Sequence, residues 1–326
     1  MDTKPARYSI TREFVEEGLR KIYPGSRIDD LISISTGFAN SIFSFTRDRT
    51  PLIIRMPPRT TPRLAYEAEL MKALYSKGLP VPTVVEYNPS YENPLGHPFM
   101  IMEKLKGKTL FEAIDTGEIQ PTPKLVAEIA NALRRVHTAE TSDLNVPKFS
   151  TLQSYLDQGL TGIKQLTKLA NFKCFEKFEE WFQSNRPADT GFNRSFIHND
   201  FHVANIMVDG ESLSGILDWN DAVVAEAQVD VAMFSLLAEA LGYPAFADAF
   251  IAEYRRISGL PLPEIRFYIT AIALQKLIQI PLQKKQMEQT GQPDKAQVLA
   301  LLISRVEKNF ARIIEENTGL LFNNPE

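Results

Sequence analysis

The chain carries HNDFHVAN at residues 198–205 and GILDW at residues 215–219. The apolar runs in and around these stretches are short and are separated by an Asp-Gly turn, a pattern typical of small strands and loops. Asp200, Asn205 and Asp218 are therefore expected at the ends of short strands. Each of these side chains can bind a metal ion or accept a proton.

A set of two carboxylates and one amide suits phosphoryl transfer. The transition state of that reaction is loose and highly charged, so a protein mainly orients the attacking hydroxyl and holds Mg²⁺ against the phosphate oxygens. One carboxylate serves the hydroxyl, and an amide oxygen with a second carboxylate serves Mg²⁺. A single loop aspartate is more often a turn former, but the joint spacing of the three residues favours catalysis.

The spacing H-x-D-x-x-x-x-N, with an aspartate thirteen residues after the asparagine, resembles the catalytic loop and metal-binding aspartate of the protein-kinase-like superfamily. Within that superfamily, ILDWNDA at residues 216–222, followed by Asp230, resembles the aminoglycoside phosphotransferase family. Asp230 precedes an apolar segment. It is expected either to cap the helix that this segment forms or to brace the catalytic loop.

The resemblance implies a role for most polar residues of the loop. Asp200 is the catalytic carboxylate, Asn205 and Asp218 are ligands of Mg²⁺, and His198 orients the loop. His202 stands at a position that the family pattern does not require, so it is read as an ordinary loop residue.

The first hundred residues predict a small sheet with helices. After a helix over residues 10–22, the short β-branched or aromatic segments LISIS, SIFSFT and PLIIRM are expected to form an antiparallel meander. A second helix begins near Pro62, and two further strands follow near residues 83–87 and 98–102. The second helix is expected to bury one face, formed at helical spacing by Leu64, Ala68, Met71 and Tyr75.

Beyond Thr109 the sequence is mainly helical. Amphipathic patterns cover residues 122–138, 151–185, 228–258 and 263–315. Together with the resemblance, this order predicts an α+β, bilobal protein-kinase-like fold. A small antiparallel-sheet N-lobe occupies residues 1–102, a hinge residues 103–108, and a mostly helical C-lobe residues 109–326.

The resemblance places the nucleotide in the N-lobe. The loop at residues 35–41 lies between two expected strands, and its Gly37, Asn40 and Ser41 are small or polar enough to offer backbone N–H groups to phosphates. The loop lacks the pattern G-x-G-x-x-G. A hairpin turn without any ligand would have the same sequence, so both interpretations stay open.

Arg55 stands on the third strand, where kinases generally carry lysine, and the resemblance implies that its charge meets the nucleotide phosphates. The guanidinium is wider and more rigid than an ammonium, which leaves the geometry of that contact open. Its acidic partner should come from the helix that follows. Glu67 borders the face marked by Leu64, whereas Glu69 points away, so Glu67 is the expected partner.

The strand FMIM at residues 99–102 leads into Glu103-Lys104-Leu105, which is similar to the hinge of the family. The resemblance implies that the purine base pairs there with backbone groups of residues such as Glu103 and Leu105. Side-chain identity is uninformative at such a contact. Met102 is expected either to line the base pocket or to belong to the ordinary core.

Composition limits the alternatives. The chain has 326 residues, a single cysteine (Cys174) and a formal net charge of −4. One cysteine excludes an internal disulfide framework. The sequence lacks the clustered basic segment that a nucleic-acid interface would need. The N-terminus has no signal-peptide pattern and no apolar run is long enough to cross a membrane. We expect a soluble, cytoplasmic protein, and the sequence does not indicate its oligomeric state.

The favoured function is transfer of the γ-phosphate of ATP or GTP, with Mg²⁺, to a hydroxyl of an aminoglycoside-like or other amine-bearing metabolite. Carboxylates of the C-lobe would bind the amines, with Glu226, Glu239 and Glu253 as candidates.

Three alternatives remain. A protein kinase is disfavoured because the interval between Asp218 and Asp230 leaves no room for a long activation segment. A catalytically silent nucleotide-binding module is disfavoured because all three polar groups of the catalytic loop are present. A metal-dependent hydrolase that uses His198, Asp200 and His202 is the most remote, because no further histidine cluster accompanies them in the sequence.

Overall fold

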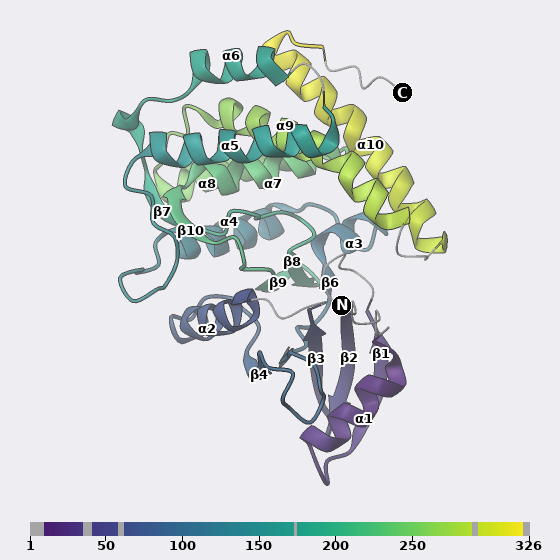
Figure 1. The fold of residues 1–326 in the computed structure, drawn as a ribbon. Coiled ribbons are helices and arrows are strands. Elements are labelled where there is room, and N and C mark those ends of the chain that lie inside the picture. Colours follow the sequence, from purple (N-terminus) through teal and green to yellow (C-terminus); the bar gives the residue numbers. More distant parts are fainter. Residues whose placement is uncertain (1–9, 35–40, 58–61, 173–174, 289–292, 322–326) are drawn as a thin grey trace. The chain divides into compact units, whose positions relative to one another are not determined.

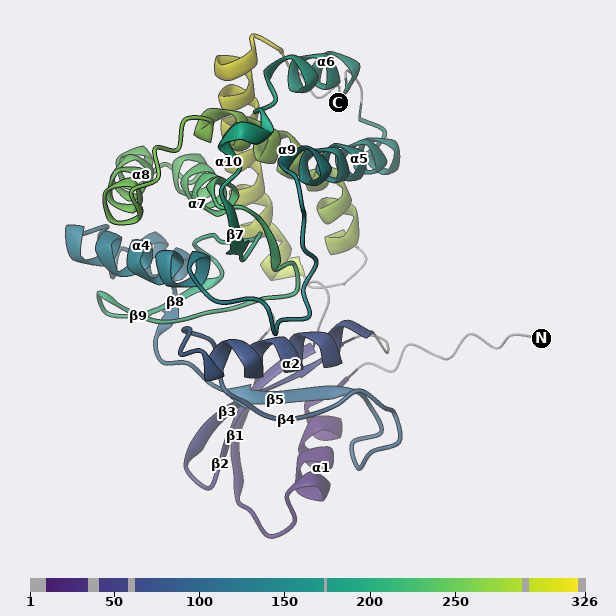
Figure 2. The same cartoon turned by 90° about the vertical axis from the view of Figure 1, so that its left-hand side faces the viewer.

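The structure, a computed structural model, describes residues 10–34, 41–57, 62–172, 175–288 and 293–321 (Figure 1). The chain divides into two compact units, Met1–Leu105 and Lys106–Glu326. The first unit contains a sheet flanked by helices, and the second is mostly helical (Figure 2). This confirms the predicted α+β, bilobal architecture.

The sheet of the first unit has five antiparallel strands in the order β1-β2-β3-β5-β4. Its strands are β1 (Ile28–Ser33), β2 (Ser41–Arg47), β3 (Thr50–Met56), β4 (Val84–Asn88) and β5 (Phe99–Glu103). The first three form the predicted meander. The fifth strand then inserts beside β3, so that β4 becomes an edge strand.

Helix α1 (Arg12–Ile22) covers the sheet on one side. It begins two residues later than expected because Thr11 is its N-cap and accepts a hydrogen bond from the Phe14 amide. Val15 and Leu19 of this helix are fully buried in one hydrophobic cluster with residues of β1, β2, β3 and β5. Burial of this apolar surface, rather than helix propensity, holds α1 on the sheet.

Helix α2 (Pro62–Ser76) contacts β4 and β5. Leu64, Ala68 and Met71 are buried, as expected. The prediction for Tyr75 was wrong, because Tyr75 is 53% exposed. Leu74 is fully buried instead. Positions three and four residues after Met71 both lie on the same side of a helix, so the periodicity allows either Leu74 or Tyr75 to be buried. In the structure it is the position three residues on.

The second unit contains two small sheets. One has the order β6-β8-β9, and the other pairs β7 with β10. The strands are β6 (Lys108–Thr109), β7 (Arg194–Ile197), β8 (Ile206–Asp209), β9 (Ser212–Ile216) and β10 (Val223–Glu226). Gly107 precedes β6 with a φ of +79°, and a Cβ at this position would collide with the carbonyl group of Val208. Only glycine fits this close approach of β6 to β8.

The helices of the second unit are α3 (Leu110–Asp115), α4 (Pro123–His137), α5 (Leu152–Ala170), α6 (Phe175–Asn185), α7 (Gln228–Ala240), α8 (Pro244–Ser258), α9 (Ile265–Glu288) and α10 (Pro293–Thr318). Each long helical pattern beyond residue 150 corresponds to two helices and not one. Helix α7 contacts both α8 and α9 and lies between them (Figure 2). Nearly all its residues are buried, so it forms the centre of this unit.

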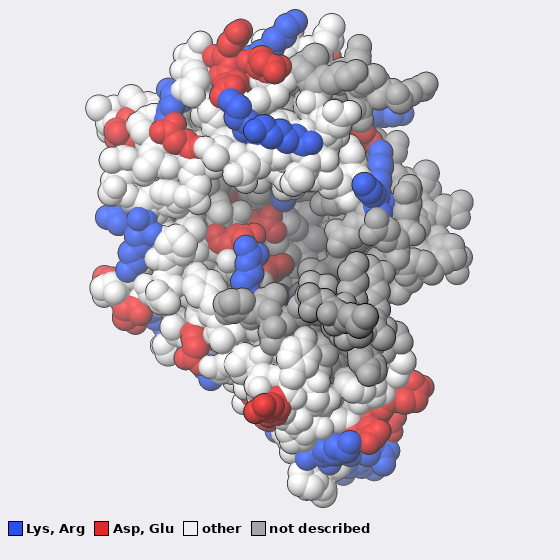
Figure 3. Space-filling model, viewed as in Figure 1, with Lys and Arg blue, Asp and Glu red and all other residues white. Residues whose placement is uncertain are grey.

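Within the described ranges, none of the helices is long and apolar enough to cross a membrane. On the face drawn in Figure 3, acidic and basic side chains are interspersed among uncharged residues.

Candidate active site

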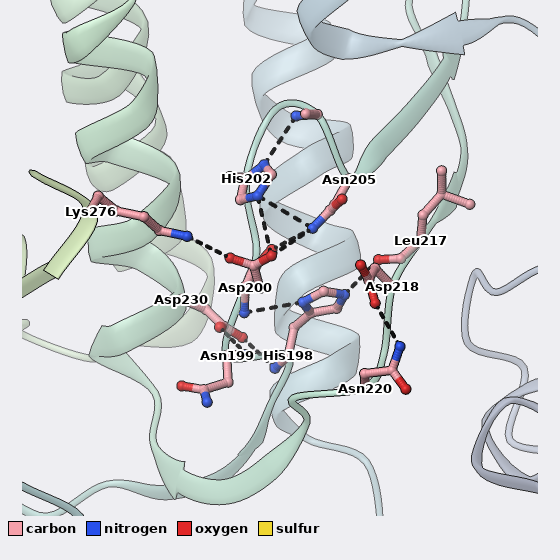
Figure 4. Close-up of polar contacts among 11 residues, drawn as sticks. His198, Asn199, Asp200, His202, Asn205, Leu217, Asp218, Asn220, Asp230 and Lys276 are labelled. Atoms are coloured by element: carbon pink, nitrogen blue, oxygen red, sulfur yellow. Dashed lines mark hydrogen bonds and ion pairs between the residues drawn. The ribbon is translucent and has the colours of Figure 1, made fainter. Parts of the chain in front are cut away.

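The loop at residues 198–200 is held in place by Asp230, which lies in the first turn of α7 and is fully buried. One carboxylate oxygen of Asp230 accepts the His198 amide at 2.7 Å, and the other accepts the Asn199 amide at 2.7 Å (Figure 4). Of its two expected roles, Asp230 therefore braces the loop. The N-cap position of α7 belongs to Ala227.

Two more buried side chains continue this network. His137 at the end of α4 approaches Oδ2 of Asp230 with Nε2, at 3.1 Å. Its Nδ1 lies 2.6 Å from the hydroxyl of Tyr254 on α8. His137 lies far from Asp230 in the sequence. The structure brings it to Asp230 across 93 residues, so three helices support the same loop.

His198 is fully buried and joins the loop to the end of β9. Its Nε2 donates to the carbonyl oxygen of Leu217 at 2.9 Å, and its Nδ1 accepts the Asp200 amide at 3.3 Å. Burial lowers the pKa of His198, and this bonding pattern is that of the neutral ring. The ring thus fixes the loop relative to the residue that precedes Asp218.

Asp200 has donors on both carboxylate oxygens. Oδ1 accepts from the Lys276 ammonium at 3.1 Å, whereas Oδ2 lies 3.1 Å from Nδ2 of Asn205 and 3.3 Å from Nε2 of His202. Burial raises the pKa of Asp200, but the hydrogen bond from His202 and the charge of Lys276 outweigh it, so the pKa lies well below its ordinary value. The group is therefore a carboxylate with a donor at each of its oxygens.

Two of the contacts to Asp200 were not predicted from the sequence. His202 was read as an ordinary loop residue, but its ring lies against the carboxylate of Asp200. Lys276 belongs to α9 and is 76 residues from Asp200. Its position in an amphipathic helix gives no signal of such a contact, whereas the i+2 spacing of His202 from Asp200 could have drawn attention to it.

Asn205 and Asp218 offer oxygen atoms suited to Mg²⁺. Nδ2 of Asn205 donates to the backbone oxygen and to Oδ2 of Asp200, which leaves its amide oxygen available to a metal ion. Asp218 is exposed, and Asn220 donates to its Oδ1 at 2.9 Å. Carboxylate and amide oxygens are ligands that Mg²⁺ prefers. No group of three or more His, Cys, Asp or Glu residues could hold a metal ion in the described part of the chain.

Backbone strain accompanies this geometry. Asn199 and Asp218 have φ angles of 66° and 61°, in the left-handed region that asparagine and aspartate tolerate best among residues with a side chain. Tyr155 donates to the side-chain oxygen of Asn199 at 2.9 Å. After Asp218, the fully buried Trp219 donates to the carbonyl oxygen of Ile216 and anchors the turn. Strained residues that are held in this way are concentrated at functional sites.

In the first unit the structure brings together the expected pair on β3 and α2. Nη1 of Arg55 lies 2.6 Å from Oε1 of Glu67, and their side chains are only 15% and 2% exposed. Glu69 is exposed and contacts Lys72 and Tyr87 instead. Helical geometry therefore distinguished the two glutamates correctly.

The remaining nucleotide candidates are spread over the loop after β1 and the end of β5. Gly37 and Asn40 lie outside the described residues, and Ser41 is the first residue of β2. Met102 is half-buried in β5, and Leu105 is half-buried at the end of the unit. Glu103 ends β5, where its carboxylate accepts the hydroxyl of Thr83 at 3.1 Å.

The three carboxylates expected to bind amines are engaged within the chain. Glu226 is fully buried and accepts the backbone amides of Asn193 and Gln228, at 2.9 and 3.2 Å. The other two form ion pairs: Glu239 with Arg312 at 3.1 Å, and Glu253 with Arg256 at 2.6 Å. The burial of Glu226 in β10 and the pairing of Glu239 with an arginine of α10 were not visible in the sequence, whereas Arg256 follows Glu253 by three residues on the same helix. That these carboxylates bind amines stays a prediction.

The chain belongs to the phosphotransferase enzyme family whose model matches residues 30–268. It is 27% identical over 177 residues to "Acyl-CoA dehydrogenase family member 11" of Pongo abelii, covering 52% of this chain but only 22% of that protein's length. It is 25% identical over 242 residues to "Homoserine kinase" of Pseudomonas aeruginosa, with 71% and 73% of the two chains covered.

Its fold is similar to that of solved aminoglycoside phosphotransferases. A thermostable mutant of aminoglycoside phosphotransferase APH(4)-Ia, in ternary complex with AMP-PNP and hygromycin B, superimposes with a TM-score of 0.60. The match covers 94% of this chain and 99% of that one at 16% identity. The predicted family and the protein-kinase-like fold are thereby confirmed.

Proposed function

We propose that the chain transfers the γ-phosphate of ATP or GTP to a hydroxyl of a small molecule in a Mg²⁺-dependent reaction. The observation that carries this proposal is the arrangement of Asp200, Asn205 and Asp218 on one loop and one strand end. The side-chain amide of Asn205 donates to the carboxylate of Asp200. The backbone carbonyl oxygen of Asn205 accepts the amide of Leu217, the residue before Asp218. This is the set of groups that phosphoryl transfer requires.

In the proposed reaction the acceptor oxygen forms a bond to the γ-phosphorus. The bond from that phosphorus to the oxygen bridging it to the β-phosphate breaks, and the electron pair leaves with the nucleoside diphosphate. The hydroxyl proton passes to the carboxylate of Asp200 and then to solvent. In a loose transition state the bond to the leaving group is largely broken before the hydroxyl oxygen becomes acidic, so a carboxylate suffices to accept the proton.

Asn205 and Asp218 would hold the metal ion through their amide and carboxylate oxygens. When bound, Mg²⁺ neutralises charge on the phosphate oxygens. Asn220 fixes one oxygen of Asp218 and leaves the other for the metal. The left-handed backbone at Asp218 and the buried Trp219 hold this carboxylate in place.

Nucleotide binding is assigned to the first unit. Arg55, held by Glu67, would contact the phosphates, and backbone amides of Gly37, Asn40 and Ser41 would add donors. The base would pair with the backbone at Glu103 and Leu105, beside Met102. These assignments are supported by the family membership and by a related fold that binds AMP-PNP.

The acceptor is proposed to be a compact, hydroxylated molecule, aminoglycoside-like or another amine-bearing metabolite. Relatives named as a homoserine kinase and as a complex with hygromycin B support a small acceptor. The short interval between Asp218 and Asp230 is occupied by β10, which supports a small molecule over a peptide. Cytoplasmic location remains our expectation from composition.

A coupled assay of nucleotide consumption tests this function. ATP and GTP are each offered with a panel of hydroxylated antibiotics, amino alcohols, hydroxy amino acids, sugars and a generic protein substrate, with and without Mg²⁺. We expect Mg²⁺-dependent consumption with at least one small acceptor, and a phosphorylated product identified by mass. Efficient transfer to protein with none to small molecules would contradict the proposal.

A further inference from the structure

Lys276 stands beside the reacting carboxylate although it lies outside residues 30–268, the range matched by the family model. Its ammonium extends from α9 to Oδ1 of Asp200 at 3.1 Å (Figure 4). The two side chains are 23% and 25% exposed, so the pair can be reached by solvent and by a ligand.

The Lys276 ammonium has more N–H donors than the described contacts use. It carries three N–H groups, and Asp200 is its only partner among the described residues. Two N–H groups are thus available to a ligand. Asn205 and His202 cover Oδ2 of Asp200, so an acceptor hydroxyl reaches this carboxylate at its Oδ1 edge, next to Nζ of Lys276. Acceptor atoms a few bonds from that hydroxyl then lie within reach of the ammonium.

The charge of this neighbour favours one class of acceptor. An ammonium close to the acceptor attracts an oxyanion and repels a second cation. The carboxylates that the sequence offered for amines, Glu226, Glu239 and Glu253, already accept from backbone amides or pair with arginines within the chain. Amines on the acceptor are therefore tolerated only away from Lys276.

We propose that Lys276 is a specificity-determining residue that selects an acceptor carrying an oxyanion, a carboxylate or a phosphate, within a few bonds of the phosphorylated hydroxyl. This inference rests on the proposed phosphotransferase function and narrows its acceptor class. Lys276 stays protonated throughout and takes no part in bond making or breaking.

Matched acceptors isolate the oxyanion. L-Homoserine is compared with 3-aminopropan-1-ol, glycerate with glycerol, and glycerol 3-phosphate with glycerol, so that the members of each pair differ in one anionic group. The measured quantity is the ratio of kcat/KM for the anionic member to kcat/KM for its partner. A ratio cancels any effect that a substitution has on folding, on Asp200 or on the nucleotide.

The variants are Lys276→Met, which removes the charge, and Lys276→Arg, which keeps it. Lys284→Met is the matched control, because Lys284 lies on the same helix and pairs with Glu307. We expect the wild type to prefer the anionic member of at least one pair. The ratio should fall roughly 10- to 100-fold in Lys276→Met, as for loss of a charged hydrogen bond, and stay within a few-fold in the other two variants.

The acceptor pairs, together with hydrolysis by water, distinguish whether Lys276 binds an oxyanion of the acceptor or the transferred phosphate. If Lys276→Met slows both members of a pair and hydrolysis by water equally, the ammonium serves the transferred phosphate or Asp200, and the proposal is overturned. A wild-type preference for uncharged or polycationic acceptors overturns it as well. If the wild type transfers phosphate to none of the acceptors in either panel, the proposed function itself fails, and this inference fails with it.

Discussion

The two units each contain an acid–base pair, and the pairs differ in burial and in how the chain forms them. Arg55 and Glu67 are 12 residues apart and nearly buried, whereas Lys276 and Asp200 are 76 residues apart and about a quarter exposed. A buried pair is costly to separate, because removing either partner leaves a desolvated charge. A partly exposed pair can exchange a partner for a ligand. This difference accords with the proposed roles, in which the first pair supports nucleotide binding and the second takes part in selection and chemistry.

The largest effect should come from Asp218→Ala in the second unit. Loss of this proposed metal ligand is expected to abolish turnover and to make nucleotide affinity nearly insensitive to Mg²⁺. If the two pairs act separately, the nucleotide affinity of Asp218→Ala without Mg²⁺ should stay close to that of the wild type, because Arg55 and Glu67 are unchanged. Turnover and nucleotide titrations with and without Mg²⁺ check this, with Asp209→Ala at an exposed turn as control. Wild-type kcat in Asp218→Ala would remove Asp218 from the site.

Asp200→Asn should lower kcat by roughly 100-fold or more and change nucleotide affinity only a few-fold. The amide keeps the shape of the carboxylate but cannot accept the hydroxyl proton or hold the Lys276 ammonium as an ion pair. Steady-state kinetics with saturating nucleotide measure kcat, and calorimetry measures binding. An effect on KM alone would give Asp200 a binding role and would weaken the contrast between the two pairs.

Glu67→Gln tests the other side of the comparison. Loss of its charge leaves Arg55 less well held, so we expect the nucleotide KM to rise about tenfold and the free energy of unfolding to fall by about 1–3 kcal/mol. The acceptor KM should hardly change. Glu69→Gln is the matched control, since Glu69 lies on the same helix but is exposed. If both variants behave alike, the Arg55–Glu67 pair does not serve the nucleotide.

The smallest effect is expected for Arg55→Lys. A lysine keeps the positive charge opposite Glu67, and it is the residue that the superfamily resemblance implies at this position. We expect the nucleotide KM to change by no more than a few-fold, because a point charge can serve phosphate oxygens nearly as well as a fork. A loss of tenfold or more would show that the planar geometry of the guanidinium is essential, and would sharpen the distinction between this pair and the lysine pair.

The sequence predicted those parts of the site that depend on local geometry. The spacing of Asp200, Asn205 and Asp218 is contained in one loop and one strand end, and helical periodicity distinguished Glu67 from Glu69. The meander of the first three strands followed from short β-branched segments and their turns, whereas the insertion of β5 beside β3 did not. Where two spacings satisfied the same periodicity, as at Leu74 and Tyr75, the pattern alone gave the wrong choice.

The sequence could not predict contacts made between elements distant in the chain. Lys276 and His137 reach the loop from α9 and α4, and which turn of a helix faces a loop depends on how the helices pack. Arg312, the partner of Glu239, lies on another helix and is visible only in three dimensions, whereas Arg256 follows Glu253 by three residues on the same helix.

The attachment of the loop to Asp230 has a consequence for its motions. The amides of His198 and Asn199 lie in a loop, where hydrogen exchange with solvent is ordinarily fast, yet both donate to a carboxylate in the buried centre of the unit. Asp230 stands on α7, and α7 packs against α8, α9 and α10. We therefore expect these two amides to exchange with solvent much more slowly than ordinary loop amides, at a rate closer to that of the helical core.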